Sequence, residues 1–187
     1  MKDDFNRCGL AAAIDSYSVR KLNACSAKMK TTFRQTPMPT VSKSVLVPHA
    51  AEVMFQLVDA VEHYPEFLPW CGGTAVLKRD ERETIATIAI RYAGVSQSFT
   101  TVNKKENHEW MRLTLRDGPF KSLQGHWHFL ALSVGACKVE LQLDYAFSNI
   151  VLEHAIGPVF GMIAETMMDR FVARAENLAS ATAEQKR

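Results

Sequence analysis

Residues 137–147 read Cys-Lys-Val-Glu-Leu-Gln-Leu-Asp-Tyr-Ala-Phe. Every odd position in this stretch is apolar, and four of the five even positions are polar or charged. A period of two, with one apolar and one polar face, is typical of a strand in a half-buried antiparallel sheet. The stretch therefore predicts a strand whose odd-numbered side chains face the interior of the protein.

The following segment, after the turn-prone Ser148 and Asn149, changes to a helical period. Its apolar residues recur at steps of three and four, as one stripe of a helix does: Val151, Leu152, Ala155, Ile156, Val159, Phe160, Ile163, Met167, Phe171 and Leu178. The pattern predicts a helix roughly 45 Å long, which Pro158 should bend or restart. A helix of this length needs a broad, curved sheet to lie on, and such a geometry can leave a cavity between helix and sheet.

The preceding part of the chain predicts the rest of that sheet. Residues 40–47 alternate as a strand that ends at Pro48, a residue that suits the first turn of a helix over residues 53–61. Pro65 and Pro69 forbid a regular helix, so the apolar segment around them is expected to form a turn. Further strands are predicted at residues 72–78, 86–92, 95–105, 110–116 and 127–131. Consecutive strands with all helices on one face predict an α+β fold with a curved antiparallel sheet wrapped around the long C-terminal helix.

Composition and charge exclude several classes of protein. The chain of 187 residues is 47% hydrophobic and 22% charged, as in an ordinary globular protein. The net charge of +2 is unevenly placed, because residues 1–37 carry seven Lys/Arg against three Asp/Glu. A mildly acidic remainder gives no bulk electrostatic reason to expect nucleic-acid binding, and no DNA partner is expected. No stretch approaches the roughly eighteen apolar residues that span a bilayer, so no transmembrane segment is expected.

The cysteines are dispersed, with no Cys-x-x-Cys pair and no spacing typical of metal ligands: Cys8, Cys25, Cys71 and Cys137. This usage predicts reduced thiols in a cytosolic protein. Cys137 in particular is expected to serve as a small apolar side chain on the inward face of its strand.

Residues 1–37 show no sustained apolar period, and three interpretations remain open. They are a disordered or non-native extension, with Met38 as the true initiator, an organelle transit peptide, or a basic arm that touches RNA. Arg, Lys and Ser residues suit a transit peptide, but Asp3, Asp4 and Asp15 count against it. We favour the first interpretation, which makes the segment dispensable.

Three motifs resemble the signatures of one family: YPxFLPxC at residues 64–71, DGPFKxLxGxWxF at 117–129, and LxYxFxN at 143–149. This is the START-like helix-grip family, within the polyketide cyclase-like superfamily, which contains the mitochondrial coenzyme Q-binding proteins and the bacterial ribosome-association toxin. The resemblance runs in order from Met38 to about Ala179 and is closest to the toxin branch. It implies one helix-grip domain over residues 38–182.

The toxin branch implies a cytoplasmic, non-enzymatic protein that binds the large ribosomal subunit and blocks joining of the small one. It also implies a small antitoxin protein as a partner. The coenzyme Q-binding relatives imply an alternative, in which the protein holds ubiquinone or another isoprenoid lipid and supports respiration. No cofactor is required for either activity. Fold alone does not choose between them.

An apolar ligand pocket is predicted because the large apolar residues exceed those needed to cover one helix. The expected lining consists of Phe67, Leu68, Trp70, Phe99, Phe120, Trp127, Phe129, Tyr145, Phe147, Ile156, Phe160 and Gly161. Gly157 and Gly161 should leave room beside Phe160 for a flat or isoprenoid ligand such as a quinone. For any one of these residues, plain core packing is the alternative.

An enzymatic or metal-dependent function finds little support. His126 and His128 share a strand face, as metal ligands often do, but no third ligand is evident. Trp127 and Phe129 take the inward positions, so the histidines are expected to face solvent. Asp117 is more simply a turn residue than an acid catalyst. GxSxG, HExxH and phosphate-binding glycine motifs are absent, so neither an enzyme nor a metal site is predicted.

Five basic residues are candidates for a contact with ribosomal RNA. Arg112 and Arg116 lie on the polar face of one predicted strand, Lys104 and Lys105 end its neighbour, and Lys121 follows the next turn. Cations grouped in this way can contact phosphates, although an ordinary solvated face is the alternative. The prediction of ribosome binding therefore rests on the family resemblance.

Overall fold

The strand and helix predicted at the end of the chain are β7 (Ala136–Phe147) and α3 (Ile150–Gln185) in the computed structural model, which describes residues 39–106 and 108–185. The odd-numbered side chains of β7 from Cys137 to Tyr145 are buried, so the predicted inward face is confirmed. Cys137 is completely buried, as expected of a small apolar side chain. The predicted extension at residues 1–37 lies outside the described residues.

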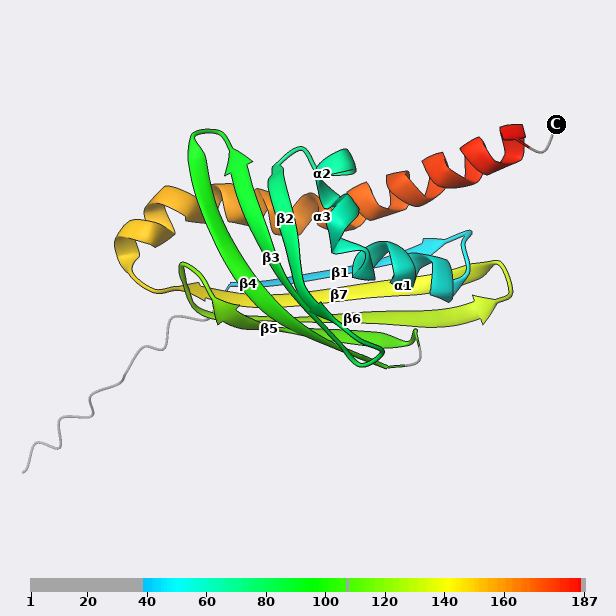
Figure 1. Cartoon of the computed structure of the whole chain (residues 1–187), viewed down its shortest axis with the longest axis horizontal. Helices are drawn as coiled ribbons and strands as arrows, with labels where there is room; N and C mark the ends of the chain where they lie inside the picture. The colour runs from blue at the N-terminus through cyan, green and yellow to red at the C-terminus, as the bar shows by residue number, and fades with distance from the viewer. Residues whose placement is uncertain (1–38, 107, 186–187) are drawn as a thin grey trace, which may run out of the picture. The chain divides into compact units, whose positions relative to one another are not determined.

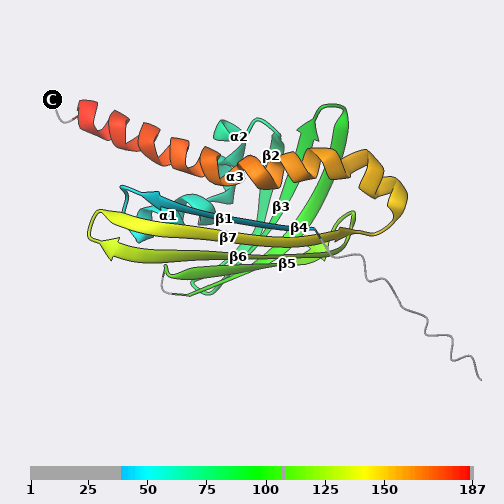
Figure 2. The same cartoon turned by 180° about the vertical axis from the view of Figure 1, so that it is seen from behind.

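Seven strands form one antiparallel sheet in the order β1-β7-β6-β5-β4-β3-β2. The other strands are β1 (Thr40–Val47), β2 (Cys71–Arg79), β3 (Glu83–Tyr92), β4 (Val95–Glu106), β5 (Trp110–Asp117) and β6 (Phe120–Ser133). Strands β2 to β7 form a meander, and β1 pairs with β7, with Thr40 opposite Asp144. The helices lie on one face of a curved sheet (Figures 1 and 2). The predicted α+β helix-grip fold is therefore confirmed.

Helix α3 runs unbroken through Pro158, so the proline does not restart it. Its first turns lie at an angle to the rest (Figures 1 and 2). The span Ile150–Ala181 contains an 18-residue window with a mean hydropathy of 1.3, and the helix is long and apolar enough to cross a membrane by length and composition. The expectation that no segment reaches that threshold was wrong for this helix. One stripe of it, which includes Ile163 and Phe171, is buried in the core, and core helices pass the same test.

The connection between β1 and β2 is formed by short helical segments. It consists of α1 (Ala51–Asp59), a 3₁₀ turn η1 (Val61–His63) and the one-turn helix α2 (Tyr64–Phe67). Pro65 lies in the first turn of α2, where a missing N–H costs no hydrogen bond. The prolines were expected to prevent a regular helix here, and α2 is accordingly limited to a single turn of four residues.

Two of the predicted turns depend on residues that accept positive φ. Ala93 and Gly94 have φ values of 49° and 81° and join β3 to β4 as a two-residue hairpin. Gly118 has a φ of 143°, and a Cβ atom there would lie 2.6 Å from Cβ of Phe99. The Asp-Gly-Pro motif thus lets the β5–β6 turn lie directly against β4.

Candidate functional site

Aromatic side chains of the core form two clusters. The first contains Phe99, Phe120, Tyr145, Phe147 and Phe160, with ring centroids 4.7–6.3 Å apart. The second contains Tyr64, Phe67, Trp127, Phe129 and Phe171, with centroids 5.3–6.1 Å apart. Edge-to-face contacts dominate both clusters, as expected from the quadrupoles of the rings.

A cavity of about 60 Å³ is lined by members of both clusters. Its lining is Val58, Val61, Tyr64, Trp70, Ile88, Phe99, Thr101, Asn103, Met111, Leu113, Leu123, Trp127, Leu143, Phe160, Ile163 and Met167. Typical small-molecule pockets measure roughly 300–1,000 Å³, so a ligand as large as one ring needs some lining side chains to move. Met111 and Met167 suit this movement because their unbranched side chains repack easily.

Four of the twelve residues predicted to line a pocket do so: Trp70, Phe99, Trp127 and Phe160. The other eight do not line this cavity: Phe67, Leu68, Phe120, Phe129, Tyr145, Phe147, Ile156 and Gly161. Seven of these pack in or against the surrounding core. Gly161 is directed elsewhere, because a Cβ atom there would meet the Tyr145 hydroxyl at 3.6 Å.

The sequence prediction missed the polar part of the lining. It placed Lys104 and Lys105 at the end of this strand, in agreement with β4, which continues to Glu106, but it followed the inward positions only as far as Phe99. Continued alternation turns Thr101, Asn103 and Lys105 toward the interior, and all three are buried. Extending the period of two past Phe99 would have found these positions.

Two residues of the cavity lining each carry a buried polar atom that has no hydrogen-bond partner. Among the described residues, the buried side-chain atoms without a partner are His49 Nε2, Trp70 Nε1 and Asn103 Oδ1, and the last two belong to the lining. Trp70 is 3% exposed and Asn103 is 7% exposed. The Tyr64 hydroxyl, by contrast, donates to the Val58 carbonyl at 2.6 Å, and burial raises the pKa of this tyrosine.

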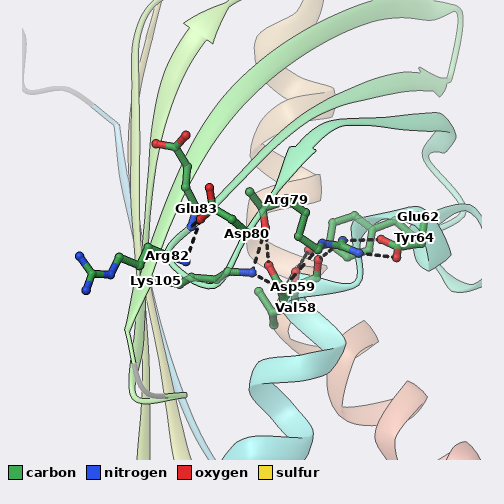
Figure 3. Close-up of polar contacts among 10 residues, drawn as sticks. Val58, Asp59, Glu62, Tyr64, Arg79, Asp80, Arg82, Glu83 and Lys105 are labelled. Atoms are coloured by element: carbon green, nitrogen blue, oxygen red, sulfur yellow. Dashed lines mark hydrogen bonds and ion pairs between the residues drawn. The ribbon is translucent and has the colours of Figure 1, made fainter.

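Lys105, the next inward residue of β4 after Asn103, takes part in an ionic network with Asp59 (Figure 3). The Lys105 ammonium lies 2.5 Å from an Asp59 carboxylate oxygen and donates to the Thr84 hydroxyl at 3.0 Å. Thr84 in turn donates to the other Asp59 oxygen at 2.9 Å. The prediction that Lys105 contacts RNA was wrong, because this side chain is 7% exposed and points inward to Asp59.

The same network fixes the end of α1 and η1 to strand β2. Arg79 donates to both carboxylate oxygens of Glu62 at 2.6 Å and to the Asp59 carbonyl at 2.8 Å (Figure 3). The hydrogen bonds from Arg79 lower the pKa of Glu62 to about 2. This connection keeps the segment that carries Tyr64 and Trp70 against the sheet.

Part of the predicted basic surface is present on the outer face of the sheet. Lys104 of β4 lies opposite Arg112 of β5, and Arg112 lies opposite His126 of β6; all three are exposed. The Arg112 guanidinium lies 5.8 Å from the centroid of the Trp110 ring. We call Lys104, Arg112 and His126 the cation row. Burial and the nearby Arg112 charge lower the pKa of His126.

The remaining predicted contacts, Arg116 and Lys121, are exposed at the end of the sheet that carries the β5–β6 turn. The β4–β5 register shifts between Thr100 and Thr101, opposite Arg116, which interrupts the alternation that placed Arg116 beside Arg112. His126 and His128 have stacked rings 6.4 Å apart, and His128 pairs with Glu140 at 3.4 Å. Within residues 39–106 and 108–185, no three His, Cys, Asp or Glu side chains are placed to hold a metal ion.

Comparison with known proteins identifies relatives of two kinds. Residues 47–172 match the model of the family described as polyketide cyclase / dehydrase and lipid transport. The ribosome association toxin RatA of Escherichia coli K12 is 42% identical over 144 residues, which cover 77% of this chain and 91% of the relative. The mitochondrial coenzyme Q-binding protein coq10 of Schizosaccharomyces pombe is 26% identical over 141 residues, which cover 71% and 84%.

Solved structures support the same fold. A START superfamily protein from Mycobacterium smegmatis superimposes with a TM-score of 0.63, covers 74% of this chain and 98% of its own, and is 21% identical. A likeness at this identity reports the architecture only. The curved sheet and its long helix are therefore shared well beyond the sequence relatives.

Proposed function

Because the chain belongs to the polyketide cyclase / dehydrase and lipid transport family, and within it to the group of the ribosome association toxin RatA, we propose that it is a non-enzymatic cytoplasmic protein that associates with the ribosome. The observation that carries this proposal is the 42% identity with RatA over 91% of that relative's length. The proposed contact is with the large subunit, and it blocks joining of the small subunit. A small antitoxin protein is the proposed regulator.

The cation row is the surface we assign to the ribosomal contact. Lys104 and Arg112 lie side by side on neighbouring strands, so both can face one stretch of phosphates. A guanidinium can bind a phosphate oxygen pair in a bidentate manner, and His126 adds a third donor to the row. Each phosphate contact releases counterions, so the interaction should weaken as salt rises.

The test is co-sedimentation of Arg112→Glu with isolated large subunits at several salt concentrations. We expect weaker binding and a salt slope smaller by about one, because one phosphate contact is lost. Arg170→Glu is the matched control, since it changes charge equally at an exposed position of α3. Equal affinity and slope for Arg112→Glu, Arg170→Glu and wild type would rule out the cation row as the contact.

A second function is favoured by the cavity, which is bordered by aromatic clusters and contains unpartnered polar atoms. We propose that the protein also holds an apolar ligand such as ubiquinone or another isoprenoid lipid. The coenzyme Q-binding relative supports this class of ligand. Native mass spectrometry of freshly purified protein, followed by lipid extraction, tests the proposal: a co-purified quinone or lipid supports it, and protein that neither carries nor takes up such molecules contradicts it.

A pair of isoleucines on α3 provides a matched test of the cavity. Ile163 lines it, whereas Ile156 is equally buried but lies outside the lining. We expect Ile163→Phe to reduce quinone uptake at nearly unchanged stability, because the cavity absorbs the added volume. Ile156→Phe should instead cost about 1–3 kcal/mol through overpacking and leave uptake intact. Thermal unfolding and quinone titration of both variants check this, and equal effects would contradict the assignment of the cavity.

A further inference from the structure

The unpartnered polar atoms are concentrated at the cavity. Two of the three such atoms in the described residues belong to residues that line it, and these residues come from separate elements. Trp70 lies in the turn between α2 and β2, and Asn103 lies in the middle of β4. The two elements are thus brought to one cavity from positions 33 residues apart in the chain, each with a polar atom that folding leaves unused.

The neighbours of Asn103 show that the lack of a hydrogen-bond partner is confined to this side chain and does not extend to the polar residues around it. Lys105, the next inward residue of β4, has partners in Asp59 and Thr84. The Tyr64 hydroxyl on the same cavity wall has the Val58 carbonyl. A polar side chain buried without a partner destabilises the protein, and an apolar residue at position 103 would remove the penalty. The cavity therefore retains a polar group that the fold itself does not use.

The chemistry of the two atoms defines their complement. The indole Nε1 of Trp70 is a donor only, so it requires an acceptor on the ligand. The Asn103 amide oxygen is an acceptor and requires a donor. A hydroxyl group serves in either role, whereas the rest of the lining is almost entirely apolar or aromatic. The cavity of about 60 Å³ limits the buried part of the ligand to at most about one ring, and side chains such as Met111 and Met167 must move to admit it.

We infer that Trp70 and Asn103 are the polar anchors of this cavity and that its ligand presents a hydroxylated aromatic ring to them. The inference rests on the proposed ligand-holding function and adds the chemical class of the buried group. Trp70 donates to one ligand oxygen, and Asn103 accepts from a ligand hydroxyl. The aromatic clusters contact the faces and edges of the ring.

Three probes of nearly equal shape separate apolar filling from anchoring: p-xylene, p-cresol and, under anaerobic conditions, hydroquinone. p-Xylene carries no hydroxyl group, p-cresol carries one and hydroquinone carries two. Isothermal titration calorimetry measures their affinities. In wild type we expect hydroquinone to bind at least as tightly as p-xylene, because the anchors replace the water that its hydroxyls lose. Trp70→Phe and Asn103→Leu should each weaken hydroquinone about tenfold and leave p-xylene unchanged or tighter. Trp110→Phe is the control for loss of an indole away from the cavity lining.

A second readout does not depend on binding. Asn103→Leu removes a buried acceptor without a partner, so we expect the ligand-free protein to melt about 2–4 °C higher. Unchanged or lower melting temperature together with unchanged hydroquinone affinity would overturn the inference. The inference would also be overturned if wild type bound p-xylene more than tenfold more tightly than hydroquinone. In that case the proposed ligand-holding function would still stand. If no probe binds wild type, the ligand-holding function itself fails.

Discussion

Replacement of Lys105 by methionine would test whether the buried ionic network holds the helical segment onto the sheet. The substitution keeps most of the side-chain volume and removes the ammonium that lies 2.5 Å from Asp59. The Asp59 carboxylate then loses its closest cation in a position where only 17% of the side chain is exposed. Removal of one partner of a buried ion pair costs about 3–5 kcal/mol because the remaining charge is uncompensated.

The structure favours the lower end of this range. Asp59 keeps the hydrogen bond from Thr84 at 2.9 Å, and Arg79 Nε lies 3.9 Å away. We therefore expect a loss of about 3 kcal/mol in the free energy of unfolding for Lys105→Met. For a protein of this size that corresponds to a melting temperature about 6–12 °C lower.

Urea and thermal unfolding measure the loss, and a double variant identifies its cause. Asp59→Leu with Lys105→Met removes both charges, so its stability should return to within about 1 kcal/mol of wild type. If Lys105→Met costs less than about 1 kcal/mol, or if the double variant is as unstable as the single one, the network is not the restraint we describe. Folded Lys105→Met should also keep the wild-type salt slope for ribosome binding, since Lys105 does not face solvent.

Two other perturbations follow from the structure. Gly118→Ala places a Cβ atom 2.6 Å from Cβ of Phe99 at a φ of 143°. We expect the free energy of unfolding, measured by urea denaturation, to fall by about 2–4 kcal/mol. Wild-type stability of this variant would contradict the described turn. Glu62 has a folded-state pKa of about 2, below its ordinary value of 4.5, so its bond to Arg79 stabilises the protein above pH 4.5 and is lost as the pH falls toward 2. Between pH 4.5 and 2, the Glu62→Gln variant should therefore lose less stability than wild type does. If the stability of the two proteins falls in parallel with pH, Glu62 does not have this role.

The elements with a single consistent period could be predicted from sequence. The alternation of β7 and the three- and four-residue steps of α3 both lead directly to the observed elements. The turn at Gly118 was also predictable from its motif, but its close approach to Phe99 was not, because that contact depends on the register between β4 and β5.

The site was predicted less well because the predicted lining consisted mainly of aromatic residues. Aromatic side chains mark the core, and only the three-dimensional arrangement shows that eight of the twelve selected residues lie outside the cavity lining. Asn103 was not considered, and Lys105 was assigned to the surface at the end of a strand, because inward positions are usually apolar. Polar residues at inward positions of a strand are themselves an indication of a site, since buried polar groups are retained where they form networks or sites.

The alternation of β4 and β5 also connects the two proposed activities. Asn103 faces the cavity and the adjacent Lys104 belongs to the cation row, while Leu113 and Arg112 take the corresponding positions on β5. The two proposed sites therefore lie on opposite faces of the same strand pair, one residue apart. If a bound ring shifts these strands, ribosome affinity must change, and reciprocity requires the ligand affinity to change by the same factor in the ribosome-bound protein. Subunit co-sedimentation with and without hydroquinone measures the first factor, and hydroquinone titration of the ribosome-bound protein measures the second. If both factors equal one, the sheet holds two independent sites. If the two factors agree but differ from one, the ligand regulates the ribosomal contact.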